Sequence, residues 1–265
     1  MTPVIYYRPC RDLDETEFEA MLANFRCVKS RLDVESGETC VARYSALPFY
    51  RELEDDLRSK GAQLVNTYRQ HRWIADLGEW TQDLDGLTPE TWRNLEQVPD
   101  SAFPVVCKGE TNSKKFQWDT HMFAADRRAA VDVMCRLQED GFLSDQWIYF
   151  RRFVPLKTYM IGLRGLPITK EFRVFVAAGR VLSRGYYWSS HVEELENPPD
   201  PNEIPDSFLA DVIERVGKSA VYYSIDIAQS EAGNWLVVEL NDGQMSGLSE
   251  NDPVVLYRGL REAMV

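Results

Sequence analysis

Residues 222–228 read YYSIDIA and residues 235–241 read WLVVELN, with a short polar loop between them. Both runs are rich in β-branched and aromatic residues and predict two strands of an antiparallel hairpin. Because side chains alternate along a strand, Glu239 and Asn241 share one face, and Asp226 reaches that face if the strands pair. Two carboxylates and an amide oxygen are ligands that Mg²⁺ prefers, so the hairpin is a candidate magnesium site. The same residues also suit an ordinary hairpin whose polar face meets water.

A second polar group is basic and lies earlier in the chain. Lys108 ends the apolar run 103–108, which predicts a strand, and Lys114 and Lys115 follow in the polar loop 109–115, GETNSKK. Flexible lysine ammonium groups suit a polyphosphate. A lysine at the end of an apolar strand indicates a cleft, whereas two adjacent lysines in a polar loop are also consistent with plain exposure to solvent.

A third group lies on the run 170–176, KEFRVFV. Its apolar residues alternate onto one face, and Glu171 and Arg173 share the other. Arg184 lies on the next predicted strand, 180–188, and could reach the same side. An acid and an arginine on the open face of a strand indicate a ligand site, although a cross-strand ion pair explains them equally well.

The order of strands and helices divides the chain into two units. The first hundred residues predict a small α/β unit, because short β-rich runs alternate with helical patterns. Its strands are expected at 4–7, 40–44 and 63–66, and its helices at 15–22, at 48–61 opened by Pro48, and at 88–95 capped by Thr88. The rest predicts strands at 103–108, 147–154, 171–177, 180–188, 222–228 and 235–241, with helices at 126–141, 208–216 and from 252.

The order of these groups resembles the ATP-grasp superfamily over roughly residues 100–250. The resemblance implies an α+β fold in which two α+β subdomains clamp ATP, preceded here by a small α/β N-terminal domain. The N-terminal domain is then 1–100 and the ATP-grasp domain 101–265. Within the latter, 101–150 is the phosphate-covering subdomain and 151–265 the metal-binding subdomain.

The resemblance also implies a role for each polar group. The Lys108 strand and its loop look like the phosphate-covering part, and residues 149–154 look like the hinge whose backbone reads the adenine edge. Glu171 matches the position that commonly holds the ribose, and Arg173 the one that commonly holds phosphate. The implied nucleotide-binding residues are Lys108, Lys114, Lys115, Arg152, Phe153, Val154, Glu171 and Arg173. The implied metal ligands are Asp226, Glu239 and Asn241, and the implied catalytic residues are Lys108, Arg173 and Arg184.

Departures from the common pattern indicate a branch of the superfamily. Gly109 is the one glycine of the covering loop, and Arg151-Arg152 stand where a Gln-Glu or similar pair is common. The lysine loop with Trp118 downstream is similar to a divergent lysine- and arginine-rich group of bacteria and phages. It is also similar to the branch of the initiation-factor-2 assembly chaperone, and the tubulin-tyrosine ligase branch shares the acid-x-Arg strand.

The resemblance leads us to expect an ATP- and Mg²⁺-dependent ligase that joins a carboxylate to an amine through an acyl phosphate. Positioning and charge neutralisation dominate phosphoryl transfer, so no nucleophilic side chain is needed. Arg184 is expected to grip the acceptor carboxylate, since guanidinium forks match carboxylates. Two alternatives stay open: an ATP-binding assembly chaperone or protein-binding module without ligase turnover, and an RNA-end ligase.

The amino-acid composition of the chain limits the classes of partner that we expect it to bind. A chain of 265 residues with 44% hydrophobic and 27% charged residues is not a disordered one. The net charge of −12 argues against non-specific nucleic-acid binding, so the expected partners are small-molecule or peptide carboxylates and amines, with a protein partner possible. Five cysteines without a CxxC, and no apolar run long enough for a membrane span, favour a cytoplasmic protein. His71, His121 and His191 have no metal-ligand spacing and are expected on the surface or in a cleft.

Overall fold

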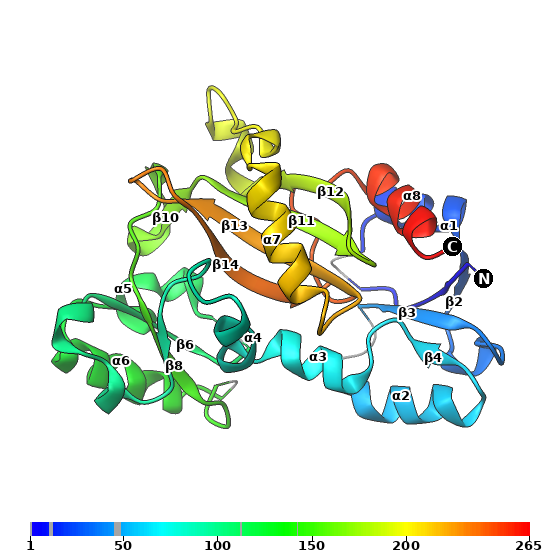
Figure 1. Ribbon diagram of the computed structural model, residues 1–265, viewed down its shortest axis with the longest axis horizontal. Helices are drawn as coiled ribbons and strands as arrows, with labels where there is room; N and C mark the ends of the chain where they lie inside the picture. The colour runs from blue at the N-terminus through cyan, green and yellow to red at the C-terminus, as the bar shows by residue number, and fades with distance from the viewer. Residues whose placement is uncertain (1, 11–12, 45–48, 112, 142) are drawn as a thin grey trace.

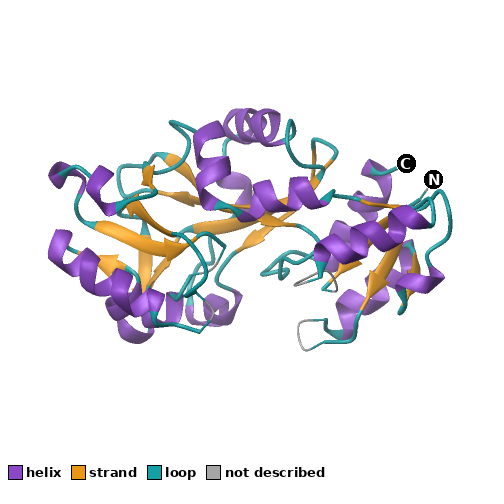
Figure 2. Ribbon diagram, turned by 90° about the horizontal axis from the view of Figure 1, so that it is seen from below, coloured by secondary structure: helices purple, strands orange, loops and turns teal. Residues whose placement is uncertain are grey.

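A computed structural model describes residues 2–10, 13–44, 49–111, 113–141 and 143–265. Three four-stranded sheets lie in a row along the long axis, and both chain ends lie at the N-terminal sheet (Figures 1 and 2). Pro48 and Asn112, which the sequence places at a helix start and in the lysine loop, lie outside the described residues. No described helix combines the length and the apolar character that a membrane crossing requires.

The N-terminal sheet is parallel, with strand order β2-β1-β3-β4. Its strands are β1 (Val4–Tyr7), β2 (Arg26–Val28), β3 (Thr39–Arg43) and β4 (Gln63–Leu64), joined by helices α1 (Glu15–Asn24) and α2 (Tyr50–Ser59). The first strand is buried along its whole length, as expected for a central parallel strand covered on both faces. This sheet therefore forms the predicted α/β unit.

The second sheet in chain order, named the middle sheet for that order, lies at the opposite end of the molecule from the N-terminal sheet (Figure 1). It is antiparallel, with order β5-β8-β6-β7. Its strands are β5 (Thr91–Trp92), β6 (Val105–Gly109), β7 (Phe123–Ala124) and β8 (Ile148–Arg152). Helices α5 (Trp118–His121) and α6 (Arg127–Gln138) follow β6 and β7, and Asp126 caps α6 by accepting a hydrogen bond from the Ala129 amide at 2.8 Å. Ala130, Val133 and Leu137 of α6 belong to the same apolar core as β6 and β8.

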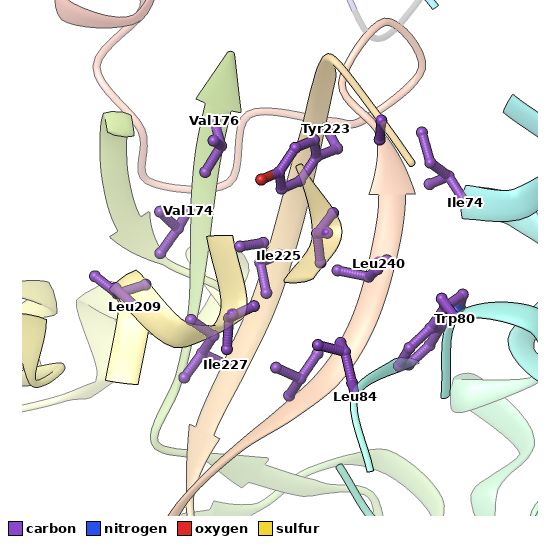
Figure 3. Packing of buried hydrophobic residues seen from close by; sticks show 14 of the residues in the cluster. Ile74, Trp80, Leu84, Val174, Val176, Leu209, Tyr223, Ile225, Ile227 and Leu240 are labelled. Carbon is purple, nitrogen blue, oxygen red and sulfur yellow. The ribbon is translucent and has the colours of Figure 1, made fainter. Parts of the chain in front are cut away.

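The third sheet is antiparallel, with order β12-β11-β13-β14, and it contains the hairpin with which the sequence analysis began. Its strands are β11 (Glu171–Ala177), β12 (Arg180–Tyr186), β13 (Tyr222–Gln229) and β14 (Trp235–Asp242). Helix α7 (Asp206–Val216) lies across one face, together with α3 (Tyr68–Ala75) and α4 (Leu77–Asp83). Figure 3 shows this packing, in which side chains of β11 and β13 meet those of the helices. On the opposite face, Phe175 and Tyr222 pack in a second core with the N-terminal sheet and α8, and the rest of that face carries polar residues.

Two further elements complete the chain. A small antiparallel pair, β9 (Thr158–Ile161) and β10 (Pro167–Thr169), links the middle sheet to the third. The last helix, α8 (Pro253–Ala263), packs against α1 and β12. Antiparallel sheets with helices gathered on one face confirm the α+β class. The domain boundaries at 100 and 150 stay predictions, and β5 takes a strand from the first hundred residues into the middle sheet.

The helix expected at 88–95 is wrong. Thr91 and Trp92 instead pair with Arg151 and Phe150 of β8 as the edge strand β5. The Thr88 hydroxyl donates to the carbonyl oxygen of Val237 at 2.8 Å, so this side chain is committed to the third sheet and does not cap a helix. A distant tertiary contact thus overrides a local capping signal.

Candidate active site

Strand register brings the polar residues of the third sheet together on the face opposite α7. Asp226 of β13 lies directly across from Arg173 of β11 on one side and from Glu239 of β14 on the other. Asn241 lies two residues beyond Glu239 and contacts Asp226, with 3.4 Å between Nδ2 and Oδ2. The prediction that Asp226, Glu239 and Asn241 share one face is confirmed by this register.

Arg173 and Asp226 form a buried two-pronged ion pair. Nε and Nη2 of Arg173 donate to the two carboxylate oxygens of Asp226, each at 2.8 Å. Asp226 is fully buried. The third nitrogen, Nη1, donates to the carbonyl oxygen of Gly247 at 2.9 Å. Although burial lowers it, the pKa of Arg173 lies above its ordinary value because Asp226 stabilises the charge.

Glu239 faces two lysines that come from the middle sheet and its loop. Nζ of Lys108, at the end of β6, donates to Oε1 of Glu239 at 2.7 Å, and Nζ of Lys115 lies 3.8 Å from Oε2. Burial raises the pKa of Glu239, but the two ammonium groups outweigh it and lower that pKa to about 2. Burial lowers the pKa of Lys108 in turn. Glu239 is therefore ionised and paired at neutral pH.

Glu171, at the start of β11, has the opposite environment. It is buried, its Oε2 accepts a hydrogen bond from the Thr169 hydroxyl at 3.3 Å, and its Oε1 has no hydrogen-bond partner among the described residues. Burial raises the pKa of Glu171, Lys115 lowers it and the carboxylates Asp226 and Glu239 raise it, with a net result of about 7. An unpartnered carboxylate oxygen in a cavity wall is an acceptor ready for a hydroxyl donor.

An apolar cavity of about 200 Å³ opens beside Glu171, between the middle and third sheets. Arg152, Phe153 and Val154 line it, as the hinge prediction requires, together with Lys108 and Lys115. The rings of Trp118 and Phe153 in its wall pack with each other and with the ring of Phe123, with centroids 5.2 to 6.4 Å apart. Such a cavity, apolar at one end and cationic at the other, fits a flat aromatic ring that carries a charged tail.

A larger cavity of about 520 Å³ begins where the apolar cavity ends. Lys108 and Glu239 line both of them. The walls of the larger cavity come from the third sheet, from α3, and from the start of α2. They include Tyr50, His71, Arg72, Glu110, Arg173, Asn241 and Asp242. The lysine–carboxylate pair thus stands at the junction of two binding spaces.

Two predicted residues lie outside this site. Arg184 lies across from Val174, so its side chain is on the α7 face, where it pairs with Asp206 at 3.1 Å. The expectation that it reaches the same cavity as Arg173 is wrong. Nζ of Lys114 lies 2.5 Å from a carboxylate oxygen of Asp140, beyond the end of α6, and Lys114 lines neither cavity.

Other residues join the site without a signal in the sequence. The Tyr187 hydroxyl accepts from Lys115 at 2.6 Å, and its ring lies 5.0 Å from the Arg173 guanidinium. Arg151 is buried and donates to the carbonyl oxygens of Val237 and Val238, which joins β8 to β14. Burial lowers the pKa of Arg151 to about 10. The hydrogen bonds of Lys115 to Tyr187 and of Arg151 to Val237 join residues 72 and 86 positions apart, so no local pattern marks them.

Two of the three predicted metal ligands are open to a hard cation. Glu239 and Asn241 line the larger cavity, whereas Asp226 is fully buried and both of its carboxylate oxygens accept from Arg173. Within the described part of the chain no group of three or more His, Cys, Asp and Glu side chains is arranged for a metal ion. A cation here would therefore take only a few protein oxygens, which is the arrangement Mg²⁺ uses when phosphates complete its shell.

Several solved structures are similar to this chain in fold. A RimK domain ATP-grasp protein from Sphaerobacter thermophilus has 16% identity and a TM-score of 0.58, over 97% of this chain and 99% of that one. D-alanine–D-alanine ligase from Bacillus anthracis, complexed with ATP, has 14% identity and a TM-score of 0.58, over 98% and 94%. The ATP-grasp ligase PsnB, complexed with a precursor variant, Mg and ADP, has 14% identity and a TM-score of 0.61, over 100% and 98%.

These likenesses show the ATP-grasp fold. Comparison with the curated proteins gave no match. The family model described as ATP-grasp domain, R₂K clade family 3, matches residues 94–260, which contain all the strands of the third sheet. This chain therefore belongs to the ATP-grasp superfamily, in family 3 of its R₂K clade.

Proposed function

We propose that the protein is an ATP- and Mg²⁺-dependent ligase that joins a carboxylate to an amine and releases ADP and phosphate. The observation that carries the proposal is the junction of the two cavities at Lys108 and Glu239. In this proposal, the apolar cavity takes the nucleotide and the larger cavity takes the substrates. The γ-phosphate then lies at the junction, beside the carboxylate that receives it.

Each residue has a defined task in this reaction. Phe153, Val154 and Trp118 enclose the adenine, and the free oxygen of Glu171 accepts a ribose hydroxyl. Lys108 and Lys115 neutralise the phosphates. Asp226, Glu239 and Asn241 would hold magnesium, which supplies positive charge to the transferring phosphoryl group.

The chemistry proceeds in two steps. A substrate carboxylate oxygen attacks the γ-phosphorus, and the bond to ADP breaks to leave an acyl phosphate. The amine then attacks the acyl carbon and phosphate leaves. Lys108, Lys115 and Arg173 stabilise the negative charge at both steps. The solved neighbours include ligases that carry a D-alanine substrate or a precursor peptide in their names, which supports small-molecule or peptide substrates.

Calorimetry with Mg-ATP tests the assignment. Glu239→Gln should weaken Mg-ATP binding by about 1–3 kcal/mol, because a charged contact to the cation is lost. Glu214→Gln, on the exposed side of α7, is the matched control and should bind as the wild type does. Equal affinity in all three proteins would remove the metal and phosphate assignment. ADP release that requires both a carboxylate and an amine distinguishes a ligase from a protein that binds ATP without turnover.

A further inference from the structure

His71, on α3, is a wall residue of the larger cavity that the reaction outlined above does not use. Its ring stacks on the ring of Tyr50, with centroids 4.1 Å apart and an angle of 12° between the planes. The residue is 6% exposed, and it lines the cavity together with Lys108 and Asn241. The ring is therefore held in one plane at the edge of the space assigned to the substrates.

One nitrogen of this ring is fixed by a carboxylate. Nδ1 of His71 lies 3.0 Å from Oδ2 of Asp242. Asp242 is buried and itself accepts from the Asn66 side chain at 3.1 Å and from the Gln244 amide at 3.0 Å. Because an ionised carboxylate only accepts hydrogen bonds, Nδ1 carries the proton and the lone pair is on Nε2. Among the described residues Nε2 has no hydrogen-bond partner.

The two glutamates of this cavity wall are engaged. Glu239 is bound to Lys108, and the lysines outweigh the effect of burial and hold its pKa at about 2, so it is a poor proton acceptor. Glu110 accepts from Arg72 at 3.1 Å and from the Trp147 amide at 3.4 Å. Lysine and arginine side chains are donors. Among the described residues of the wall, the His71 imidazole combines an available lone pair with an oriented ring.

We propose that His71 is the general base that activates the amine substrate. This inference rests on the proposed ligase function and assigns one step of it. An amine enters water-filled sites mainly as an ammonium ion, which has no lone pair for attack. Nε2 of His71 takes one proton from it. The freed lone pair forms the C–N bond at the acyl carbon, the C–O bond to phosphate breaks, and the leaving phosphate takes the second N–H proton.

Asp242 has a positioning role in this step. It holds the tautomer that leaves Nε2 unprotonated, and it stabilises the imidazolium that forms. Asp242 also directly follows Asn241 in β14, so the base is tied to the strand that carries the candidate metal ligands. The proton acceptor and the candidate metal ligands Glu239 and Asn241 are therefore positioned by one strand.

The test compares two kinds of nucleophile. Hydroxylamine is unprotonated at neutral pH and needs no base, whereas ammonia and amino acids are mostly protonated. Each reaction contains Mg-ATP and one of the twenty L-amino acids as the carboxylate substrate. The nucleophile is hydroxylamine, ammonium chloride or the amino group of an amino acid, and the amount of product is measured. His71→Asn keeps an amide donor for Asp242 but removes the base. It should slow ligation with protonated amines on the order of 10²–10⁴-fold and leave hydroxamate formation within about threefold of wild type.

The controls separate the possible failures. Arg69→Gln, on the exposed side of α3, should behave as wild type with all nucleophiles, and both this variant and His71→Asn should keep Mg-ATP affinity. His71→Gln is the second variant if His71→Asn does not fold, with the same expectation. If His71→Asn lowers the rate equally with hydroxylamine and with protonated amines, or lowers neither rate, the base role alone is overturned. The base role is also overturned if the wild type forms product with hydroxylamine but with no protonated amine. A wild type that forms no product with any nucleophile would overturn the ligase function itself.

Discussion

Glu171 and Glu239 show how two carboxylates on one sheet face receive opposite properties. Both are drawn from water, but Glu239 has an ammonium group at 2.7 Å and Glu171 has only a hydroxyl donor. Burial then dominates for Glu171 and raises its pKa to about 7, whereas the lysines lower the pKa of Glu239 to about 2. Glu171 is suited to accept a hydrogen bond from a neutral hydroxyl group, and Glu239 is suited to face cations.

This difference predicts a pH dependence of stability. A carboxyl whose pKa is raised from 4.5 to about 7 on folding binds its proton more tightly in the folded state. It stabilises the fold fully below pH 4.5, and this contribution is lost as the pH rises from about 4.5 to about 7. Glu171→Gln removes that loss, which is on the order of 3 kcal/mol. Urea unfolding from about pH 4.5 to about pH 8 should show the stability of the variant rising relative to wild type over this range.

The quantity to compare is the difference in unfolding free energy between the variant and the wild type at each pH, because other groups titrate in the same pH range. Glu214→Gln should leave the profile unchanged, since this side chain is exposed on α7. Parallel profiles for wild type and Glu171→Gln would show that Glu171 is ionised at all these pH values. Glu239 contributes in the opposite sense, with stability lost as the pH falls from 4.5 toward 2.

At the scale of elements, the loop between β6 and α5 holds its two lysines differently. Lys115 begins a 3₁₀ turn (Lys115–Gln117) and reaches Tyr187 and Glu239 across the site. Lys114 turns the other way and pairs with Asp140. Both lysines are expected to cover the phosphates, but in this structure Lys115 lies in the site and Lys114 lies outside it.

Lys115→Ala should lower Mg-ATP affinity at least tenfold, because a phosphate-facing charge is lost. Lys114→Ala is the matched control and should change affinity by less than about threefold. Calorimetry measures both, and amide hydrogen exchange over residues 113–121 should slow when Mg-ATP is added, since a loop that covers phosphates becomes ordered. Equal effects of the two substitutions, with unchanged exchange, would contradict a covering role for the loop.

Most strands of the third sheet could be predicted from the sequence. Their apolar residues alternate, and the predicted strand 171–177 is β11 as observed. The side of the sheet that Arg184 occupies could not be predicted, because it depends on register. Arg184 pairs with Val174, and a shift of one residue would have placed it beside Arg173 on the other face. The site residues that the sequence analysis missed, such as His71, are brought in from separate elements by tertiary packing.

At the scale of the whole molecule, the N-terminal unit and the third sheet share one apolar core. Ile5 and Val41 of the first sheet pack in the same cluster as Phe175 and Tyr222 of the third and Leu260 of α8. The unit that carries His71 and Tyr50 is therefore joined to the third sheet by buried surface rather than by a linker. The geometry of the larger cavity depends on this contact.

Arg43 adds a polar connection at the same place. This side chain is fully buried at the end of β3 and pairs with Glu17 at 2.7 Å. It also donates to three carbonyl oxygens of the segment that follows β14, those of Gly243, Gln244 and Ser246, at 2.7 to 3.2 Å. That segment continues to Gly247, whose carbonyl oxygen accepts from Arg173. Arg43 thus holds the backbone segment 243–247, and the end of this segment accepts a hydrogen bond from Arg173.

Arg43→Met should lower the free energy of unfolding by about 3–5 kcal/mol, because Glu17 is left as an unpaired buried charge. Unfolding followed by tryptophan fluorescence and by far-ultraviolet circular dichroism should still give one coincident transition, since the core is shared. Arg58→Met, on an exposed side of α2, is the control and should cost less than about 0.5 kcal/mol. Two separate transitions in the wild type would show that the N-terminal unit folds independently.

The contact between Lys108 and Glu239 has a consequence for which form of the nucleotide can enter. Each of these charges serves as the counter-ion of the other. A lone divalent cation would take Glu239 and leave a buried ammonium unpaired, and a lone triphosphate would take Lys108 and place its charge against a carboxylate. When the cation and the triphosphate arrive together, Glu239 exchanges Lys108 for the cation and Lys108 exchanges Glu239 for the phosphates, so each charge keeps a partner. With the proposed function, the pair would thereby discriminate against free metal, free ATP and inorganic phosphate, and would select the preformed metal–nucleotide complex.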